Sequence, residues 1–297
     1  MNSLFVKQHA QIVLLQLVFV GLISSAAGAE SIQYPQVSAN VTFADVLALE
    51  YAEADVKLAY GSEQPELQSG LLWLPATANA AQRDSAQKLP LLIFIHGGCW
   101  LNSFDVSHTF AFSTGLAQAG YAVWSLEYRR TGDAGGGWLG TFDDVLAGIQ
   151  WRANLQDYPI ATDNYVIMGH SAGGYLALLA GTRSSEARAV IGLAAIADLV
   201  QYAQAEGTCQ AAANSFMGTD PASDPELFTQ ANPAQLQLHN KSYLLEGTAD
   251  EIVPMSATPI AGTSQLLAND AGHFDWVHPG TLAFAQLLQL LATVFSP

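Results

Sequence analysis

Positive charge is scarce in this sequence. Lysine and arginine together number 10, against 26 aspartate and glutamate residues, and the formal net charge is −16. Such a surface repels nucleic acid and anionic lipid, so neither is expected as a partner. The excess of acid favours solubility and carries no information about a reaction.

Cysteine is rarer still, with only Cys99 and Cys209. Neither has a Cys or His neighbour at the spacing of metal ligands, so we expect no metal site. The two residues allow a single disulfide, which can form in an exported protein. The sequence leaves open whether they meet.

Long apolar runs are missing after the first thirty residues, which excludes a later membrane-spanning helix. The first thirty contain Lys7, an apolar run interrupted by Gln16, and the small residues Ala27-Gly28-Ala29. This layout predicts a signal peptide at residues 1–29 and an exported protein, periplasmic or secreted. The alternative, an uncleaved anchor, usually needs about 20 apolar residues. After cleavage we expect no stable membrane association.

Linkers, low-complexity tracts and repeats are also absent, so residues 30–297 are interpreted as one domain. Short apolar runs alternate there with helical patterns, which favours a mostly parallel sheet with helices on both faces. The strand candidates are residues 89–97, 121–128, 165–170, 189–196 and 241–247, with 265–269 weaker and an edge hairpin at 55–60 and 69–75. Residues 199–238 are polar and proline-containing, and they predict an excursion over the sheet.

The stretch G-H-S-A-G-G at residues 169–174 follows the strand candidate Y-V-I-M and precedes a helical pattern. G-x-S-x-G at such a junction indicates a nucleophile elbow, in which the turn lifts a serine hydroxyl above the sheet. Ser171 is therefore a candidate nucleophile. An ordinary strand-to-helix turn would use the same glycines, so the rest of the site has to decide.

A site for a negatively charged oxygen is expected after the run L-L-I-F-I, where H-G-G-C-W occupies residues 96–100. Serine hydrolases stabilise an oxyanion with backbone N–H groups, and adjacent glycines leave such a backbone uncovered. The candidate donors are the amides of Gly98, Cys99 and Ala172.

The base and its acid should follow the serine along the chain, the acid first. Asp250 follows the strand candidate Y-L-L, and His273 follows Q-L-L-A. His273 would accept the Ser171 proton, while Asp250 would orient the imidazole. Glu251 and Asp275 are rivals of Asp250, which its place at the end of a strand favours.

The remaining aromatic and imidazole side chains are mostly assigned to structural roles. Trp100 and Trp138 are candidates for walls of the substrate pocket, since both lie near the motifs in sequence. His108 and His239 are interpreted as surface or helix-cap residues. His170 is expected to point away from the nucleophile.

With these motifs the chain resembles the α/β-hydrolase superfamily over nearly all of residues 30–297. The H-G-G-C-W loop is similar to the H-G-G-x-W signature of kynurenine formamidases and their carboxylesterase relatives. The G-H-S-A-G-G elbow is also found in hormone-sensitive-lipase-like esterases. The resemblance implies a central sheet of about eight strands and a triad of Ser171, Asp250 and His273.

The leading hypothesis is a cofactor-free serine esterase that forms an acyl-enzyme on Ser171 and acts on short-chain, aryl or acetylated esters. A second hypothesis keeps the triad but cleaves an amide, as an arylformamidase does. A third is a hydrolase-fold binding protein without catalysis. The predicted export signal favours the esterase, because formamidases of tryptophan breakdown work inside cells. Nothing in the sequence indicates the oligomeric state.

Overall fold

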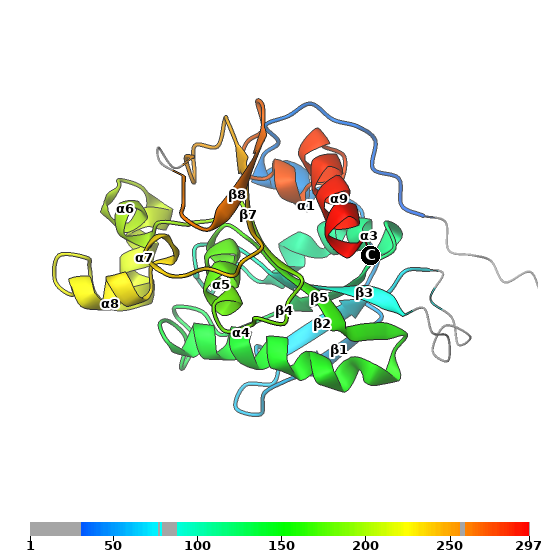
Figure 1. Cartoon of the computed structure of the whole chain (residues 1–297), viewed down its shortest axis with the longest axis horizontal. Coiled ribbons are helices and arrows are strands. Elements are labelled where there is room, and N and C mark those ends of the chain that lie inside the picture. Colours follow the sequence, from blue (N-terminus) through cyan, green and yellow to red (C-terminus); the bar gives the residue numbers. More distant parts are fainter. Residues whose placement is uncertain (1–30, 77, 79–87, 256–258, 297) are drawn as a thin grey trace, which may run out of the picture. The chain divides into compact units, whose positions relative to one another are not determined.

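The computed structural model describes residues 31–76, 78, 88–255 and 259–296, which contain an eight-stranded sheet (Figure 1). The sheet has the strand order β1-β2-β4-β3-β5-β6-β7-β8. β2 pairs antiparallel with both β1 and β4, and all other neighbours are parallel. The predicted signal peptide lies outside the described residues. The strands are β1 (Val56–Ala59), β2 (Ser69–Trp73), β3 (Leu89–Ile95), β4 (Ala122–Leu126), β5 (Ile160–His170), β6 (Ala189–Leu193), β7 (Ser242–Gly247) and β8 (Thr263–Ala268).

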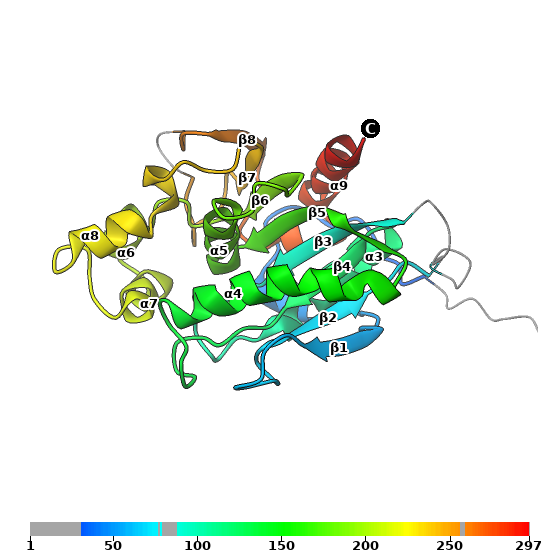
Figure 2. The ribbon, with the colours of Figure 1, turned by 60° about the horizontal axis from the view of Figure 1, so that its bottom comes forward.

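Alternate residues of the central strands enter two separate hydrophobic cores, one on each face of the sheet. In β3, Leu91 and Ile93 pack in the core covered by α4 and α5. Leu92 and Phe94 pack in the other core, which α3 and α9 cover. Figures 1 and 2 show these two helical layers on opposite sides of the sheet. The covering helices are α3 (Phe110–Gln118), α4 (Gly140–Trp151), α5 (Ala172–Gly181) and α9 (Leu282–Phe295).

The polar stretch between β6 and β7 forms short helices instead of strands, in keeping with the expected excursion. They gather at one end of the sheet in Figures 1 and 2. Asp198 and Asp224 cap two of them by accepting hydrogen bonds from backbone amides of the first turn. The elements are α6 (Leu199–Gln204), α7 (Thr208–Met217), α8 (Pro225–Gln230) and the 3₁₀ turn η3 (Pro233–Gln235).

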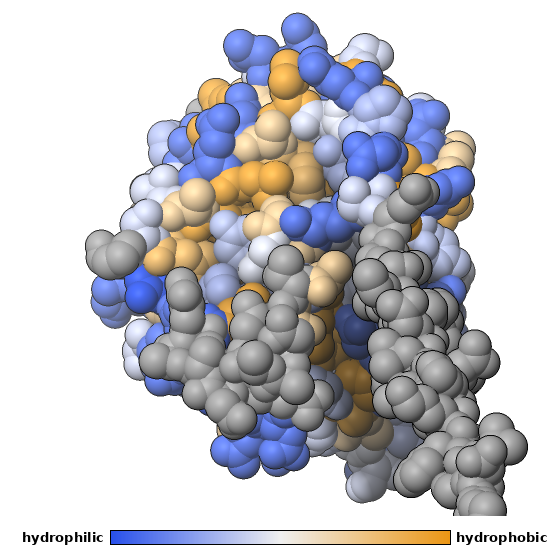
Figure 3. Space-filling view, turned by 90° about the vertical axis from the view of Figure 1, so that its right-hand side faces the viewer, coloured by the Kyte–Doolittle hydropathy of each residue, from blue (hydrophilic) through white to orange (hydrophobic). Residues whose placement is uncertain are grey.

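One short helix, α1 (Phe43–Leu47), precedes the sheet, and three further 3₁₀ turns join the larger elements. None of the helices in the described part of the chain is long and apolar enough to cross a membrane. On the face seen in Figure 3, hydrophilic side chains surround areas of apolar surface. The remaining turns are η1 (Val106–Thr109), η2 (Arg152–Asp157) and η4 (Asp275–Val277).

Candidate active site

Ser171 lies at the junction between β5 and α5, with φ 56° and ψ −121°. Residues with a side chain rarely adopt this conformation. Hydrogen bonds hold the turn: the Ser171 amide donates to the Leu193 carbonyl over 2.9 Å, and the Tyr175 amide donates to the Ser171 carbonyl over 3.1 Å. A Cβ atom on Gly173 would lie 2.2 Å from the carbonyl oxygen of His96, so only glycine fits there. This is the geometry of a nucleophile elbow.

Ser171 and His273 line the same pocket, which has a volume of about 430 Å³. Most of its remaining wall is apolar. No carboxylate is among the described residues of that wall. The apolar side chains are those of Phe43, Leu101, Phe104, Ile252 and Phe274.

His273 and Asp250 form a buried pair beside the serine. Nδ1 of His273 donates a hydrogen bond to Oδ2 of Asp250 over 2.8 Å. The other carboxylate oxygen accepts from the amides of Ile252 and Val253, over 2.9 and 2.8 Å, which fixes its direction. Within the described residues no hydrogen bond joins Ser171 to His273, but both residues line the same pocket. Such contacts are often long in substrate-free enzymes.

The two rival carboxylates occupy other positions. Asp275 accepts three backbone hydrogen bonds, from Asn40 over 3.0 Å, Val41 over 3.1 Å and Gly272 over 2.9 Å. Glu251 is exposed and lines a separate cavity. Asp250 is therefore the carboxylate that the fold brings to His273.

The three amides expected to bind an oxyanion come from two residues of the pocket wall and from the residue after Ser171. Gly98 and Cys99 line the pocket with φ angles of 107° and 52°, and Ala172 is the first residue of α5. In the part of the chain that the structure describes, none of these amides donates a hydrogen bond to another residue. Uncommitted N–H groups of this kind near Ser171 are compatible with the expected oxyanion site.

The loop that carries Gly98 and Cys99 is tied to the excursion helices. Cys99 forms a disulfide with Cys209 of α7, with the Cα atoms 5.2 Å apart. This resolves the pairing that the sequence left open. The next residue, Trp100, stacks on Phe216 of α7 with ring centroids 4.8 Å apart. The loop is thereby held to α7 by one covalent bond and one aromatic contact.

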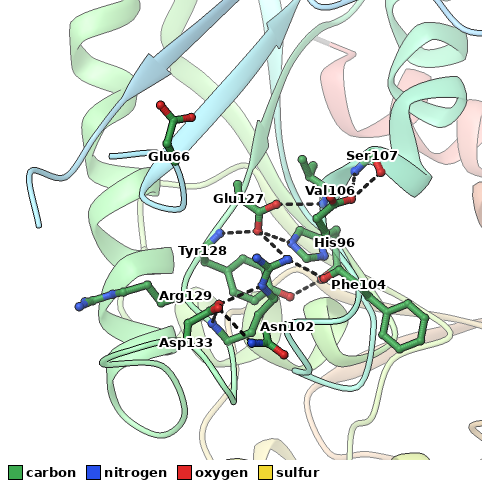
Figure 4. A network of polar contacts seen from close by, with 12 residues as sticks. Glu66, His96, Asn102, Phe104, Val106, Ser107, Glu127, Tyr128, Arg129 and Asp133 are labelled. Carbon is green, nitrogen blue, oxygen red and sulfur yellow. Dashed lines mark hydrogen bonds and ion pairs between the residues drawn. The ribbon is translucent and has the colours of Figure 1, made fainter. Parts of the chain in front are cut away.

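A buried polar network holds the other side of this loop (Figure 4). His96 lies between two acceptors, the carbonyl oxygen of Gly97 at 2.7 Å and Oε1 of Glu127 at 3.1 Å. Glu127 also accepts from the Val106 amide and pairs with Arg130. Burial acts to raise the pKa of Glu127, but His96, Arg130 and these hydrogen bonds outweigh it and lower the pKa. The ionised carboxylate therefore anchors the start of the loop.

Both tryptophans proposed as pocket walls lie elsewhere, and this corrects the sequence interpretation. Neither is among the described residues that line the pocket. Trp100 is wholly buried between Phe216 and Tyr175. Trp138 stacks on Phe142 of α4. Both rings pack instead against Phe216 of α7, that of Trp138 edge-on with the ring centroids 6.1 Å apart.

Two histidines assigned to structural roles line the pocket instead. Of the two roles expected for His108, surface or helix-cap residue, the surface position is wrong: the residue is buried, and its Nδ1 donates to the Asp105 carbonyl over 2.6 Å. His170 points toward the base, since its Nε2 lies 2.9 Å from the carbonyl oxygen of His273. Phe43 is a pocket residue that the sequence interpretation missed.

The described residues include no group of three or more His, Cys, Asp or Glu side chains placed to hold a metal ion.

Known proteins with related sequences and folds include several esterases. Esterase LipC of Mycobacterium tuberculosis is 32% identical over 98 residues, which are 33% of this chain and only 24% of that protein. A truncated carbohydrate esterase from gut microbiota superposes with a TM-score of 0.68 at 19% identity, over 83% of this chain and 98% of that one. Esterase B from Lactobacillus rhamnosis gives a TM-score of 0.66 at 20% identity, over 85% and 89%.

Because these two structural relatives are only 20% and 19% identical to this chain, the likeness shows the fold and nothing further. The sequence model of one family, BD-FAE, matches residues 80–262, which is more than half of the chain. The matched segment contains the H-G-G-C-W loop, the Ser171 elbow and Asp250, and it ends before His273. Sequence, sheet topology and elbow geometry thus agree: the chain belongs to the BD-FAE family and has the α/β-hydrolase fold.

Proposed function

We propose that the protein is a serine esterase that hydrolyses short-chain, aryl or acetylated carboxylic esters without a cofactor. The observation that carries this proposal is the buried Asp250–His273 pair, whose histidine shares a pocket with a serine at an elbow turn. The similarity to several esterases supports the same conclusion. These relatives are distant in sequence, or this chain covers only part of their length. The proposed substrate class is therefore argued from the residues of the site.

In the first half of the reaction, His273 takes the proton of Ser171 as the hydroxyl oxygen attacks the ester carbonyl carbon. Asp250 stabilises the imidazolium that forms. The carbonyl oxygen becomes an oxyanion and accepts hydrogen bonds from the uncommitted amides of Gly98, Cys99 and Ala172. One donor of this kind is worth about 10²–10³ in rate.

The second half of the reaction releases the products. The imidazolium gives its proton to the leaving alcohol, and an acyl group remains on Ser171. Water then attacks the acyl carbon while His273 accepts the water proton, and the acid departs as the serine is regenerated. An aryl formamide would follow the same course with an amine as the leaving group.

We further propose that the mature protein is exported. The pattern of residues 1–29 supports this, and so does the Cys99–Cys209 disulfide, because disulfides persist mainly in oxidising compartments. Cell fractionation with an N-terminal sequence of the exported form would test it. A cytosolic protein that retains residues 1–29 would contradict it.

The esterase proposal is tested with p-nitrophenyl acetate, butyrate and octanoate beside N-formylkynurenine. We expect ester turnover to be lost in Ser171→Ala and kcat to fall by about 10⁴ in Asp250→Asn. Glu251→Gln, the neighbouring exposed carboxylate, is the matched control and should behave as the wild type. Turnover that survives in Ser171→Ala would refute the mechanism, and faster formamide cleavage would make the protein an amidase.

A further inference from the structure

One wall of the pocket comes from a segment far from the catalytic motifs. Phe43 is the first residue of α1 and lines the pocket beside Ser171 and His273. It precedes the first strand of the sheet, and it lies outside the residues that match the BD-FAE family. The family resemblance therefore gives no account of this side chain.

The segment that carries Phe43 is fixed to the loop of His273. Asp275, two residues after His273, accepts hydrogen bonds from the amides of Asn40 and Val41 over 3.0 and 3.1 Å. The same carboxylate accepts from the amide of Gly272 on the other side of His273. One buried side chain thus joins the N-terminal segment to the loop that supplies the base.

The start of α1 is fixed as well. Thr42 and Asp45 form a reciprocal capping box: the Asp45 amide donates to the Thr42 hydroxyl, and the Asp45 carboxylate accepts from the Thr42 amide over 2.8 Å. A capping box satisfies amides at the first turn and fixes the direction in which the chain enters the helix. Val46, one turn later, is buried in the core below.

The ring of Phe43 fits among three other rings of the pocket. Its centroid lies 5.4 Å from that of Phe274, 5.7 Å from that of His108 and 5.9 Å from that of Phe104. All three of these residues also line the pocket. A ring with neighbours at these distances is in aromatic contact with each and fills the space between them.

We propose that Phe43 closes one end of the pocket and so sets the size of the apolar group that a substrate can place there. This inference rests on the proposed esterase function. The wall is apolar and rigidly attached, so its effect is steric: a smaller side chain lengthens the pocket, and a larger one shortens it. A difference of a few methylene groups in a hydrophobic pocket changes specificity by about tenfold or more.

The experiment measures kcat/KM for p-nitrophenyl octanoate relative to p-nitrophenyl acetate, and for octyl acetate relative to ethyl acetate. These series vary the acyl and the alcohol side. We expect Phe43→Ala to raise at least one of the two ratios by about tenfold. Phe43→Leu should give a smaller rise in the same ratio, and Phe43→Trp should lower it.

Val46→Ala is the matched control, because it removes a buried side chain from the same helix and is not among the described residues of the pocket wall. Its ratios should equal those of the wild type. Equal shifts in Val46→Ala and Phe43→Ala would overturn the inference, since they would point to a loosened segment. Unchanged ratios in all three Phe43 variants would also overturn it.

Failure of the inference can be told apart from failure of the esterase proposal. If turnover depends on Ser171 but ignores the size of residue 43, only the role of Phe43 is wrong. If turnover persists in Ser171→Ala, the esterase mechanism itself is wrong. Circular dichroism identifies any variant that does not fold. If Phe43→Ala does not fold, Phe43→Leu, which removes less of the side chain, tests whether residue 43 sets the selectivity.

Discussion

Nε2 of His170 donates a hydrogen bond to the carbonyl oxygen of His273 over 2.9 Å, so the residue before Ser171 holds the backbone of His273. A carbonyl oxygen only accepts, and Nε2 must therefore carry the hydrogen. Burial, and then the nearby His273, hold the pKa of His170 well below its ordinary value. This shift favours the neutral ring over the imidazolium beside His273.

Replacing this donor should impair catalysis more than binding. In His170→Leu the His273 carbonyl loses its partner and the base loop shifts, and we expect kcat to fall by about tenfold with little change in KM. His170→Gln, whose Nε2 can occupy the same place, should retain most of the activity. Steady-state kinetics on p-nitrophenyl acetate measure both variants. Wild-type kcat in His170→Leu would contradict the role.

Opening the Cys99–Cys209 disulfide should affect both stability and rate. It closes a loop with a sequence separation of 110 residues, and a bond of this kind stabilises by about 2–4 kcal/mol. Because the Cys99 amide is one of the proposed oxyanion donors, we expect Cys209→Ser to lower kcat as well. Urea unfolding and steady-state kinetics measure the two effects.

The control for this prediction is chemical. A reductant should lower kcat in the wild type and leave that of the double variant Cys99→Ala/Cys209→Ala unchanged. Thiol titration shows when the bond has opened. A wild type that keeps its full kcat with two free thiols would show that α7 does not position the loop.

Acid should destabilise the fold through His108. Burial, and then the charge of His96, lower the pKa of His108 from 6.5 to about 4. Between these values the unfolded chain binds the proton and the folded one does not, so the free energy of unfolding falls as the pH falls from 6.5 towards 4. The slope contributed by one such group is at most about 1.4 kcal/mol per pH unit.

His108→Asn tests this contribution, because the asparagine amide can still donate to the Asp105 carbonyl but does not titrate. Urea unfolding at several values between pH 4 and 7 should give a shallower dependence in the variant. His170 titrates in the same direction and remains in both proteins, so part of the slope should persist. Identical slopes would show that His108 contributes nothing.

The strands of the sheet centre were predicted well because they are buried on both faces. The runs at 89–97 and 189–196 correspond to Leu89–Ile95 and Ala189–Leu193. β8 gave a weaker pattern, since most of its side chains are partly or fully exposed. β5 begins at Ile160, earlier than expected, because Ile160 and Ala161 pair with Leu89 and Pro90 of β3. The register then shifts past the polar residues 162–164, and pairing resumes between Leu91 and Tyr165.

The positions of candidate site residues could be predicted from the sequence where the residue comes directly after a predicted strand. The positions of Ser171, Asp250 and His273 follow from the sheet, because parallel strands end at one edge. Side-chain direction inside a loop is not encoded in this way, and Trp100 and Trp138 were misplaced for that reason. Phe43 left one local signal, the capping sequence T-F-A-D, which indicates that a helix begins but not where it docks.

The separate origin of the pocket wall has a practical consequence for altering the enzyme. The groups proposed to react are fixed by the sheet, whereas part of the pocket wall comes from α1 and α7. Asp275 joins the segment before α1 to the loop of His273, and the disulfide joins α7 to the loop of Cys99. Sequence variation confined to these two helices would change which esters fit while leaving the reacting atoms in place. A combinatorial library over residues 40–47 and 206–212, with Cys209 kept so that the disulfide remains, is therefore a compact route to new selectivity in this scaffold.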